Sequence, residues 1–295
     1  MKPESTLSTF TAGDGENLAV QDWPLADDVP LRGVVVLVHG LGEHAARYDQ
    51  LAQRLNSWGF AVRGYDQHGH GESGGSRGRL PSDDRLIDDL DDVVQSTRAR
   101  MLRDTPLVVL GHSLGALVAA RFAVLARRPV DGLVLSSPGL DPGFNTVQKL
   151  ALATVPTIAP HLRMHNGLDP AWLSRDPAVV QAYRADRYCH DRMSVRMARF
   201  IAASGPIVMA KAPTWGVPTL LLYAGNDKLV PPAGSRAFAA AAPPDIVTAQ
   251  CFDGLYHDLF NELDNDAVFE TLQRWLDQRF PDTVALVPAL NRDWV

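Results

Sequence analysis

The chain has 295 residues and a formal net charge of −6 at pH 7; 46% of its residues are hydrophobic and 21% are charged. These values are typical of a globular protein with one large domain or two small ones, and they exclude a disordered or collagen-like chain. The acidic balance argues against nucleic acid as a partner, and two cysteines, Cys189 and Cys251, are too few for a disulfide framework and fit a reducing compartment.

We expect no targeting signal in the first segment of the chain. Its opening residues, MKPESTLSTF, lack the apolar core of a signal peptide, and no window of the sequence reaches the ~18 apolar residues of a membrane span. The prediction is therefore a cytoplasmic protein, peripheral to a membrane surface at most. Residues 7–23 then hold a Gly-Asp-Gly turn between two strand-like runs, which predicts an antiparallel hairpin at a sheet edge.

Six short apolar runs follow, and their β-branched residues are typical of strands that are buried on both faces. They span residues 33–40, 59–66, 106–113, 130–138, 218–227 and 247–254. Amphipathic helical patterns lie between them, one from Tyr48 to Trp58 and one after Ser82 as N-cap. The inward face of the second consists of Leu86, Leu90, Val93, Val94 and Met101. This alternation predicts an α/β fold with a mostly parallel central sheet flanked by helices.

The alternation of strands and helices breaks after Pro138 and returns at the strand-like run from residue 218. The sequence therefore predicts a core of residues 1–140 and 214–295, with residues 141–213 inserted as a helical cap. The insertion contains nine Lys or Arg, five Asp and no Glu, so its charge is +4 against −10 for the remainder. A solvated helical surface is the plainer interpretation of that charge, and transient contact with an anionic membrane surface is the functional one.

Residues 108–124, VVLGHSLGALVAARFAV, interrupt a strand with Gly-His-Ser-Leu-Gly and resume at once as an Ala-rich helix. In an open parallel sheet, ligands bind beyond the carboxyl ends of the strands, and a sharp strand-to-helix turn exposes a serine hydroxyl there. Gly111 and Gly115 remove side chains that would collide in such a turn. We therefore predict that Ser113 is a nucleophile; the alternative is an incidental G-x-S-x-G in a loop.

A serine hydroxyl needs a base at neutral pH, and the base needs an orienting acid. Of nine histidines, His257 follows the last predicted strand, where the base stands in the chain order serine, acid, histidine. His112, the neighbour of the serine, is expected to point away along the turn. Asp227 ends the preceding predicted strand and is the favoured acid, while Asp141 is its rival. An Asx-turn is the structural alternative for Asp227.

An oxyanion hole needs backbone N–H groups that point at the developing negative charge. The residue after the nucleophile, Leu114, supplies one of them. We predict that Leu41, in the glycine-rich stretch VHGLGEH, supplies the other. The alternative for this stretch is an ordinary glycine turn between a strand and a helix.

His68 and His70 form an HGHG stretch whose spacing invites a metal site. No third histidine or cysteine lies close to them in the sequence, however, and a zinc site needs at least three protein ligands. The sequence therefore predicts neither a metal site nor a cofactor.

Five stretches together resemble the α/β-hydrolase superfamily, and within it the branch of monoacylglycerol lipases and bacterial lysophospholipase-like serine hydrolases. HGLGEHAARY, YDQHGHGESGGSRG, GHSLGA, AGNDKLVPP and GLYHDLFNE look like the oxyanion loop, glycine-rich loop, nucleophile turn, acid loop and histidine loop of that branch. WLSRDPAVVQAYRAD is similar to its cap. The chain departs from the pattern at Ala116, where a second glycine is usual, and at DRYCH, which replaces Asp-Pro-Leu in the cap.

The resemblance implies a lid over an apolar acyl tunnel, with the glycerol end of the substrate near the catalytic serine. Apolar residues at helical spacing in the insertion are then candidates for contact with the acyl chain, chiefly Val155, Ile158 and Tyr183. The resemblance also implies a set of residues that support the oxyanion loop, namely Glu43, His44 and Arg47.

The leading hypothesis is a serine esterase that cleaves monoacylglycerols or similar single-chain lipid esters through an acyl-enzyme. A carboxylesterase or a lysophospholipase with another head-group preference is the alternative within enzymes. A hydrolase-like protein that binds without catalysis is the alternative outside them, and such proteins typically lose a member of the triad. Ser113 also disfavours haloalkane dehalogenases and epoxide hydrolases, which place an aspartate at that position. The sequence makes no prediction of the oligomeric state.

Overall fold

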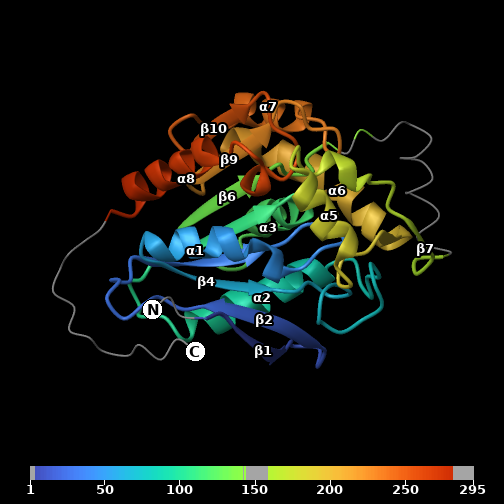
Figure 1. The fold of residues 1–295 in the computed structure, drawn as a ribbon, viewed down its shortest axis with the longest axis horizontal. Helices are drawn as coiled ribbons and strands as arrows, with labels where there is room; N and C mark the ends of the chain where they lie inside the picture. Colours follow the sequence, from blue (N-terminus) through green and yellow to red (C-terminus); the bar gives the residue numbers. More distant parts are fainter. Residues whose placement is uncertain (1–3, 142, 144–158, 282–295) are drawn as a thin grey trace.

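An eight-stranded sheet forms the centre of the molecule in the computed structural model, which describes residues 4–141, 143 and 159–281 (Figure 1). The strand order is β1-β2-β4-β3-β5-β6-β9-β10. The strands are β1 (Thr6–Thr11), β2 (Asn17–Trp23), β3 (Gly33–Val38), β4 (Phe60–Tyr65), β5 (Leu107–His112), β6 (Gly132–Ser136), β9 (Thr219–Ala224) and β10 (Val247–Phe252).

Six strands of this sheet pair in parallel, namely β4, β3, β5, β6, β9 and β10. Strands β1 and β2 pair antiparallel with each other, and β2 pairs antiparallel with β4. The predicted hairpin therefore lies at one edge of the sheet, and each of the six predicted central strands is present. The prediction of a mostly parallel sheet is confirmed. Because the parallel strands run the same way, the loops that follow them meet at one edge of the sheet.

Helices cover both faces of the sheet and bury its two rows of alternating side chains. On one face, Val36 and Val38 pack with α2 (Arg85–Arg98) and α3 (Leu114–Leu125). On the other, Val35 and Leu37 pack with α1 (Asp49–Ser57) and α8 (Asp266–Arg279). A further helix, α7 (Ala233–Ala241), lies between β9 and β10 in the chain. Burial on both faces explains why the strand sequences are continuous apolar runs.

The second predicted helix starts later and ends earlier than its sequence pattern suggested. The N-cap of α2 is Asp84 rather than Ser82, and Met101 lies beyond the end of the helix at Arg98. Residues 81–84 form bends before the helix begins, so the serine signal two residues upstream does not cap it.

The segment between β6 and β9 contains α5 (Pro177–Ala185) and α6 (Val195–Lys211), which lie together at one end of the molecule (Figure 1). It also contains two three-residue strands, β7 (Arg163–His165) and β8 (Arg192–Ser194), which pair antiparallel and were not predicted. No helix in the described ranges is long and apolar enough to cross a membrane.

Helix α6 packs against the core, although it belongs to the predicted cap. Met197, Phe200 and Val208 join the same apolar cluster as α3. A side chain on Gly205 would collide with the carbonyl oxygen of Leu140, so the helix lies directly on the chain that leaves β6. The division into a core and a cap of residues 141–213 remains a prediction, and its last helix is packed as a core helix is.

Candidate active site

Ser113 lies at the sharp turn between β5 and α3, with φ 53° and ψ −115°. Few residues other than glycine adopt a positive φ, and such strain persists where the surrounding structure enforces it. The two flanking glycines leave room for close backbone contacts. A Cβ on Gly115 would collide with the carbonyl oxygen of Val38, and a Cβ on Gly111 would collide with that of Gly115. The turn therefore presents Ser113 at the carboxyl edge of the sheet.

A pocket opens above Ser113 and encloses about 390 Å³, part of it open to solvent. Its core side includes Leu41, Ser113 and His257, and its far side is formed by the insertion. The insertion contributes Leu168, Asp169, Pro170, Leu173 and Tyr183. The lining combines four leucines and a proline with a small set of polar groups, as is typical of small-molecule sites.

His257 faces Asp227, and the Nδ1–Oδ2 distance is 2.7 Å. Because an ionised carboxylate only accepts hydrogen bonds, Nδ1 carries the proton and Nε2 is free to act as a base. The other carboxylate oxygen of Asp227 accepts the backbone N–H groups of Leu229 (2.9 Å) and Val230 (2.8 Å). The carboxylate is therefore held by three donors while it orients the imidazole.

The contact between His257 and Asp227 shifts the pKa values of both side chains. Burial lowers the pKa of His257, but the facing carboxylate of Asp227 outweighs it, so the pKa lies above the usual 6.5. Burial raises the pKa of Asp227, but His257 and two backbone N–H groups bring it below its usual value. The site thus favours an ionised aspartate beside a basic histidine.

The rival acid lies elsewhere. Asp141 is exposed, and its Oδ1 accepts the backbone N–H of Gly143 at 3.0 Å, which makes it an Asx-turn residue. Of the two carboxylates that the sequence left open, the structure brings Asp227 to His257.

The loop after β3 runs alongside the serine. A Cβ on Gly40 would lie 3.3 Å from the Cβ of Ser113, and Leu41 lines the pocket. The N–H of Leu114 belongs to the first turn of α3, where backbone donors have no acceptor within the helix. The two residues predicted to supply the oxyanion hole therefore lie on two segments that meet at Ser113.

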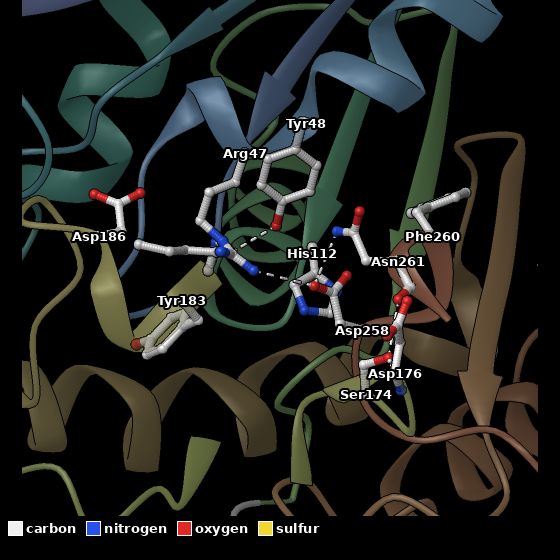
Figure 2. A network of polar contacts seen from close by, with 12 residues as sticks. Arg47, Tyr48, His112, Ser174, Asp176, Tyr183, Asp186, Asp258, Phe260 and Asn261 are labelled. Atoms are coloured by element: carbon white, nitrogen blue, oxygen red, sulfur yellow. Dashed lines mark hydrogen bonds and ion pairs between the residues drawn. The ribbon is translucent and has the colours of Figure 1, made fainter. Parts of the chain in front are cut away.

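A buried carboxylate fixes this loop. Glu43 Oε1 accepts the N–H of Gly40 and the hydroxyl of Tyr48, both at 2.6 Å, and its Oε2 accepts from Arg47 Nε at 3.0 Å. Burial raises the pKa of Glu43, but the charge of Arg47 and other neighbours lowers it to about 2. Figure 2 shows Arg47 reaching toward Asp258, whose Oδ2 lies 3.6 Å from the guanidinium. The residue next to His257 is thus linked to the loop of Leu41.

The sequence suggested that His112 points away from the site, but in the structure it faces the site. It is buried, it lines the pocket, and its ring centroid lies 4.7 Å from that of His257. Its Nδ1 lies 3.2 Å from Ser136 Oγ. The expectation was wrong because the turn at Ser113 swings the chain into α3, which leaves the last side chain of β5 facing the histidine loop.

Ser137 is a site residue that the sequence did not reveal. It follows β6 with φ 46°, and its hydroxyl donates to the backbone carbonyl of His257 at 2.8 Å. The short run Ser-Ser-Pro after a strand was the available signal, but it gives no indication of a partner 120 residues away in the chain.

Of the three cap residues predicted to contact substrate, Tyr183 lines the pocket. Its hydroxyl donates to the carbonyl of Gly42 at 3.1 Å, and the guanidinium of Arg47 lies 4.9 Å from the centroid of its ring. Val155 and Ile158 lie outside the described residues. Leu168 and Leu173 line the pocket from irregular segments, where helical spacing could not identify them.

A family model described as serine aminopeptidase, S33, matches residues 29–264. The chain belongs to this family of α/β-hydrolases. It is 33% identical to a monoacylglycerol lipase of Mycolicibacterium smegmatis over 91% of this chain and 95% of that protein. It is 32% identical to phospholipase YtpA of Bacillus subtilis over 87% of this chain and 99% of that protein.

Solved structures share the fold. The crystal structure of a monoacylglycerol lipase from Paleococcus ferrophilus matches with a TM-score of 0.78 at 31% identity, over 94% of this chain and 100% of that one. Among sequence relatives, the chain is also 28% identical to an uncharacterized abhydrolase domain-containing protein of Dictyostelium discoideum, and it spans 30% of the length of that protein. The protein is therefore a serine hydrolase with an α/β-hydrolase fold, and the predicted family, fold and enzyme class are confirmed.

Proposed function

We propose that this protein hydrolyses carboxylic esters of single-chain lipids, monoacylglycerols foremost, through an acyl-enzyme on Ser113. The observation that carries the proposal is a pocket lined by Ser113, His257 and several leucines, with Asp227 bonded to the imidazole of His257. The relatives named monoacylglycerol lipase support the substrate class.

The proposed reaction follows from the order of these groups. His257 Nε2 removes the hydroxyl proton of Ser113 as Oγ attacks the ester carbonyl. The N–H groups of Leu41 and Leu114 stabilise the oxyanion. The imidazolium then protonates the departing glycerol alkoxide, which leaves an acyl-enzyme. A water molecule, activated by the same histidine, attacks the acyl carbonyl and releases the fatty acid.

The pocket lining supports a lipid rather than a fully polar substrate. Leu41, Leu168, Leu173 and Leu229 supply apolar surface for an acyl chain. Each CH₂ group buried there contributes about 0.8 kcal/mol. Asp169 and the hydroxyl of Tyr183 are polar groups on the insertion side of the pocket that suit the hydroxyls of a glycerol head group.

The insertion is proposed to act as a cap that guides substrate from a membrane surface, on a protein that is otherwise cytoplasmic. Exposed apolar side chains support this: Leu162, Met164 and Trp172 are 57%, 42% and 38% exposed. The basic charge of the insertion supports it less, because Arg175 and Arg196 form ion pairs with acidic residues of the core. Membrane contact is therefore proposed to rest mainly on apolar surface.

A lysophospholipase activity is the second candidate, favoured by the similarity to the phospholipase of Bacillus subtilis. Both activities use the same serine and differ in the head group, so turnover of monoacylglycerols and lysophospholipids of equal chain length separates them.

The experiment that tests the proposal compares wild-type protein with Ser113→Ala and with Ser57→Ala, an exposed serine at the end of α1. We expect a fluorophosphonate probe to label the wild type and Ser57→Ala but not Ser113→Ala. Turnover of a monoacylglycerol by Ser113→Ala should fall by up to ~10⁶-fold, since triad members act as a unit. Undiminished turnover by a folded Ser113→Ala protein would disprove the mechanism.

A further inference from the structure

A second cluster of chemistry-bearing side chains lies outside the pocket. His44 belongs to the loop after β3, whereas Asp186 and Cys189 belong to the turn that follows α5 in the insertion. One ligand atom from each of the three residues lies within 4.8 Å of the other two. We infer that His44, Asp186 and Cys189 form a binding site for a zinc-class transition-metal ion that bridges the insertion and this loop.

Local geometry points the ligand atoms at one another. His44 Nε2 lies 2.7 Å from Asp186 Oδ2. The N–H of Cys189 donates to the carbonyl of Asp186 at 3.2 Å, which closes a turn and brings the two insertion side chains together. Tetrahedral zinc ligands sit ~2.0–2.3 Å from the ion. An ion that replaces the proton between His44 and Asp186 needs only small side-chain shifts to reach the thiol.

The carboxylate is already oriented as a metal ligand would be. Asp186 Oδ1 accepts the backbone N–H of Tyr188 at 2.8 Å, which leaves Oδ2 directed at His44. Ligating carboxylates in metalloproteins are held by such outer hydrogen bonds. The ring of Tyr188 packs against that of His44 with a centroid distance of 5.5 Å, which limits rotation of the imidazole.

Burial and charge favour a transition metal over Mg²⁺ or Ca²⁺. His44 is buried, while Asp186 and Cys189 are half-buried, so an ion and a water ligand can reach the cluster from solvent. A thiolate, an imidazole and a carboxylate make a soft-to-borderline donor set, which selects Zn²⁺ and its neighbours. The carboxylate and the thiolate together balance a divalent charge. The guanidinium of Arg47 contacts the Cys189 thiol and lies close to Asp186, but its charge is balanced by its ion pairs with Glu43 and Asp258.

The thiol must lose its proton when the ion binds. Metal binding is therefore coupled to release of that proton, because the thiolate is the form that ligates metals, and the affinity increases with pH.

An ion at this position would join segments that already touch beside the pocket. The N–H of His190 donates to the carbonyl of Gly42 at 2.9 Å, and the hydroxyl of Tyr183 donates to the same carbonyl at 3.1 Å. Gly42 is the neighbour of Leu41 in the pocket wall. Metal occupancy therefore clamps the insertion to the loop that carries a predicted oxyanion donor.

The chain offers two incomplete versions of the cluster as internal controls. Cys251 Sγ lies 3.2 Å from Asp253 Oδ1, and His165 Nε2 lies 3.3 Å from Asp191 Oδ2. Within the described ranges neither pair belongs to a three-ligand group, whereas His44, Asp186 and Cys189 do. Cys251→Ser and Asp191→Asn therefore remove a thiol or a carboxylate without touching the proposed site.

The test is a Co²⁺ titration of the full-length, reduced protein, followed by displacement with Zn²⁺. The wild type, Cys251→Ser and Asp191→Asn should each bind one Co²⁺ with a near-ultraviolet thiolate-to-cobalt band, which Zn²⁺ abolishes. Cys189→Ser should lose the band. Asp186→Asn should bind Co²⁺ at least ~10–100-fold more weakly than the wild type, because removal of an outer partner of a ligand already causes a loss of affinity of that size.

Circular dichroism and thermal unfolding of each metal-free variant establish that it is folded. If Cys189→Ser or Asp186→Asn does not fold, His44→Gln tests the same site through its third ligand and should also weaken Co²⁺ binding. The proposal is overturned if the wild type shows no saturable band, if Cys189→Ser keeps the band, or if Cys251→Ser removes it. None of these outcomes depends on the esterase reaction.

Discussion

The ionisation of His257 is decided by two opposed effects in the same few ångströms. Burial favours the neutral ring, and the carboxylate of Asp227 favours the charged one more strongly, so the pKa is raised. The carboxylate itself remains charged because it accepts hydrogen bonds from Leu229 and Val230.

Asp227→Asn should reduce kcat on the order of 10⁴-fold, because an orienting carboxylate fixes the tautomer and stabilises the imidazolium. Asp141→Asn should leave kcat close to wild type, since that side chain is exposed and accepts the N–H of Gly143 in its own turn. The two variants are compared in one ester assay with matched protein concentrations. A large loss in Asp141→Asn with little loss in Asp227→Asn would reverse the assignment.

The pH profile of kcat/KM should rise from acid to neutral pH with a midpoint above 6.5. The sign follows from the role of the group: a general base works in its neutral form, and the pKa of His257 is raised above 6.5. In Asp227→Asn the residual activity should have a lower midpoint, because burial then acts without the opposing carboxylate. A profile that is flat between acid and neutral pH would contradict the role of His257.

Glu43→Gln should lower kcat with little change in KM, by roughly 10–100-fold, because a small displacement of a positioning group is costly. The carboxylate holds Gly40, Tyr48 and Arg47 together, and the neutral amide loses the charge-assisted contacts. Stability provides an independent check. The depressed pKa of about 2 contributes stability above pH 4.5, which is lost as the pH falls toward 2.

Urea unfolding of wild type and Glu43→Gln at pH 7 and about pH 3 measures that contribution. We expect the stability difference between the two proteins to shrink at the lower pH. An equal difference at both pH values would show that Glu43 acts by packing rather than by its charge.

The sequence predicted which residues come together at the candidate site, but not the direction of every side chain. Ser113 and His257 line one pocket and Asp227 contacts His257, as the strand-end motifs suggested, while their catalytic roles stay predictions. His112 and Ser137 were beyond the sequence because their partners come from a loop more than a hundred residues later. Local pattern carries no information on such distant contacts.

The turn between β5 and α3 requires a glycine at position 115. Gly115 allows the start of α3 to lie against the end of β3, so one position fixes both the helix and the strained serine. Gly115→Ala should therefore destabilise the protein by about 3 kcal/mol or more, the range reached when backbone atoms must move in a packed core. Chemical denaturation measures the free energy of unfolding.

Gly216→Ala is the matched control for this substitution, because a Cβ there meets no atom within 4 Å. At such an unstrained site the change should be neutral or stabilising by ~0.4–1 kcal/mol, since alanine restricts the unfolded chain. Similar effects of both substitutions would mean that the close approach at Gly115 does not limit stability.

Elements were predictable in proportion to their length and periodicity. The six central strands are continuous apolar runs, and each lies within the range that its sequence suggested. Strands β7 and β8 have three residues each, too few to establish an alternating pattern, and they form only because the insertion folds back on itself. The start of α2 was misplaced because Ser82 and Asp84 both carry N-cap chemistry.

Different parts of the insertion have two different structural roles in the whole protein. Helix α6 packs on α3 and completes the core. The segment from Leu168 to Tyr183 instead faces the pocket and forms its outer wall. Part of the excess positive charge of the insertion is neutralised by ion pairs such as Arg196–Asp83, which join the insertion to the core. Chain-length preference should therefore respond to changes in the outer wall and not to changes on the exposed side of α6.

Leu168→Asp tests whether the outer wall of the pocket binds the acyl chain. The side chain of Leu168 lines the same pocket as Ser113 and is half-buried in an irregular segment, so the substitution should leave the core helices intact. A buried acyl chain loses about 0.8 kcal/mol for each CH₂ group that no longer meets apolar surface. Turnover of a long-chain monoacylglycerol should therefore fall much more than turnover of a butyrate ester of the same alcohol. Ile207→Asp, on the exposed side of α6, serves as the control and should change neither ratio nor rate. Equal losses on long and short esters in Leu168→Asp, at unchanged stability, would show that this wall does not bind the acyl chain.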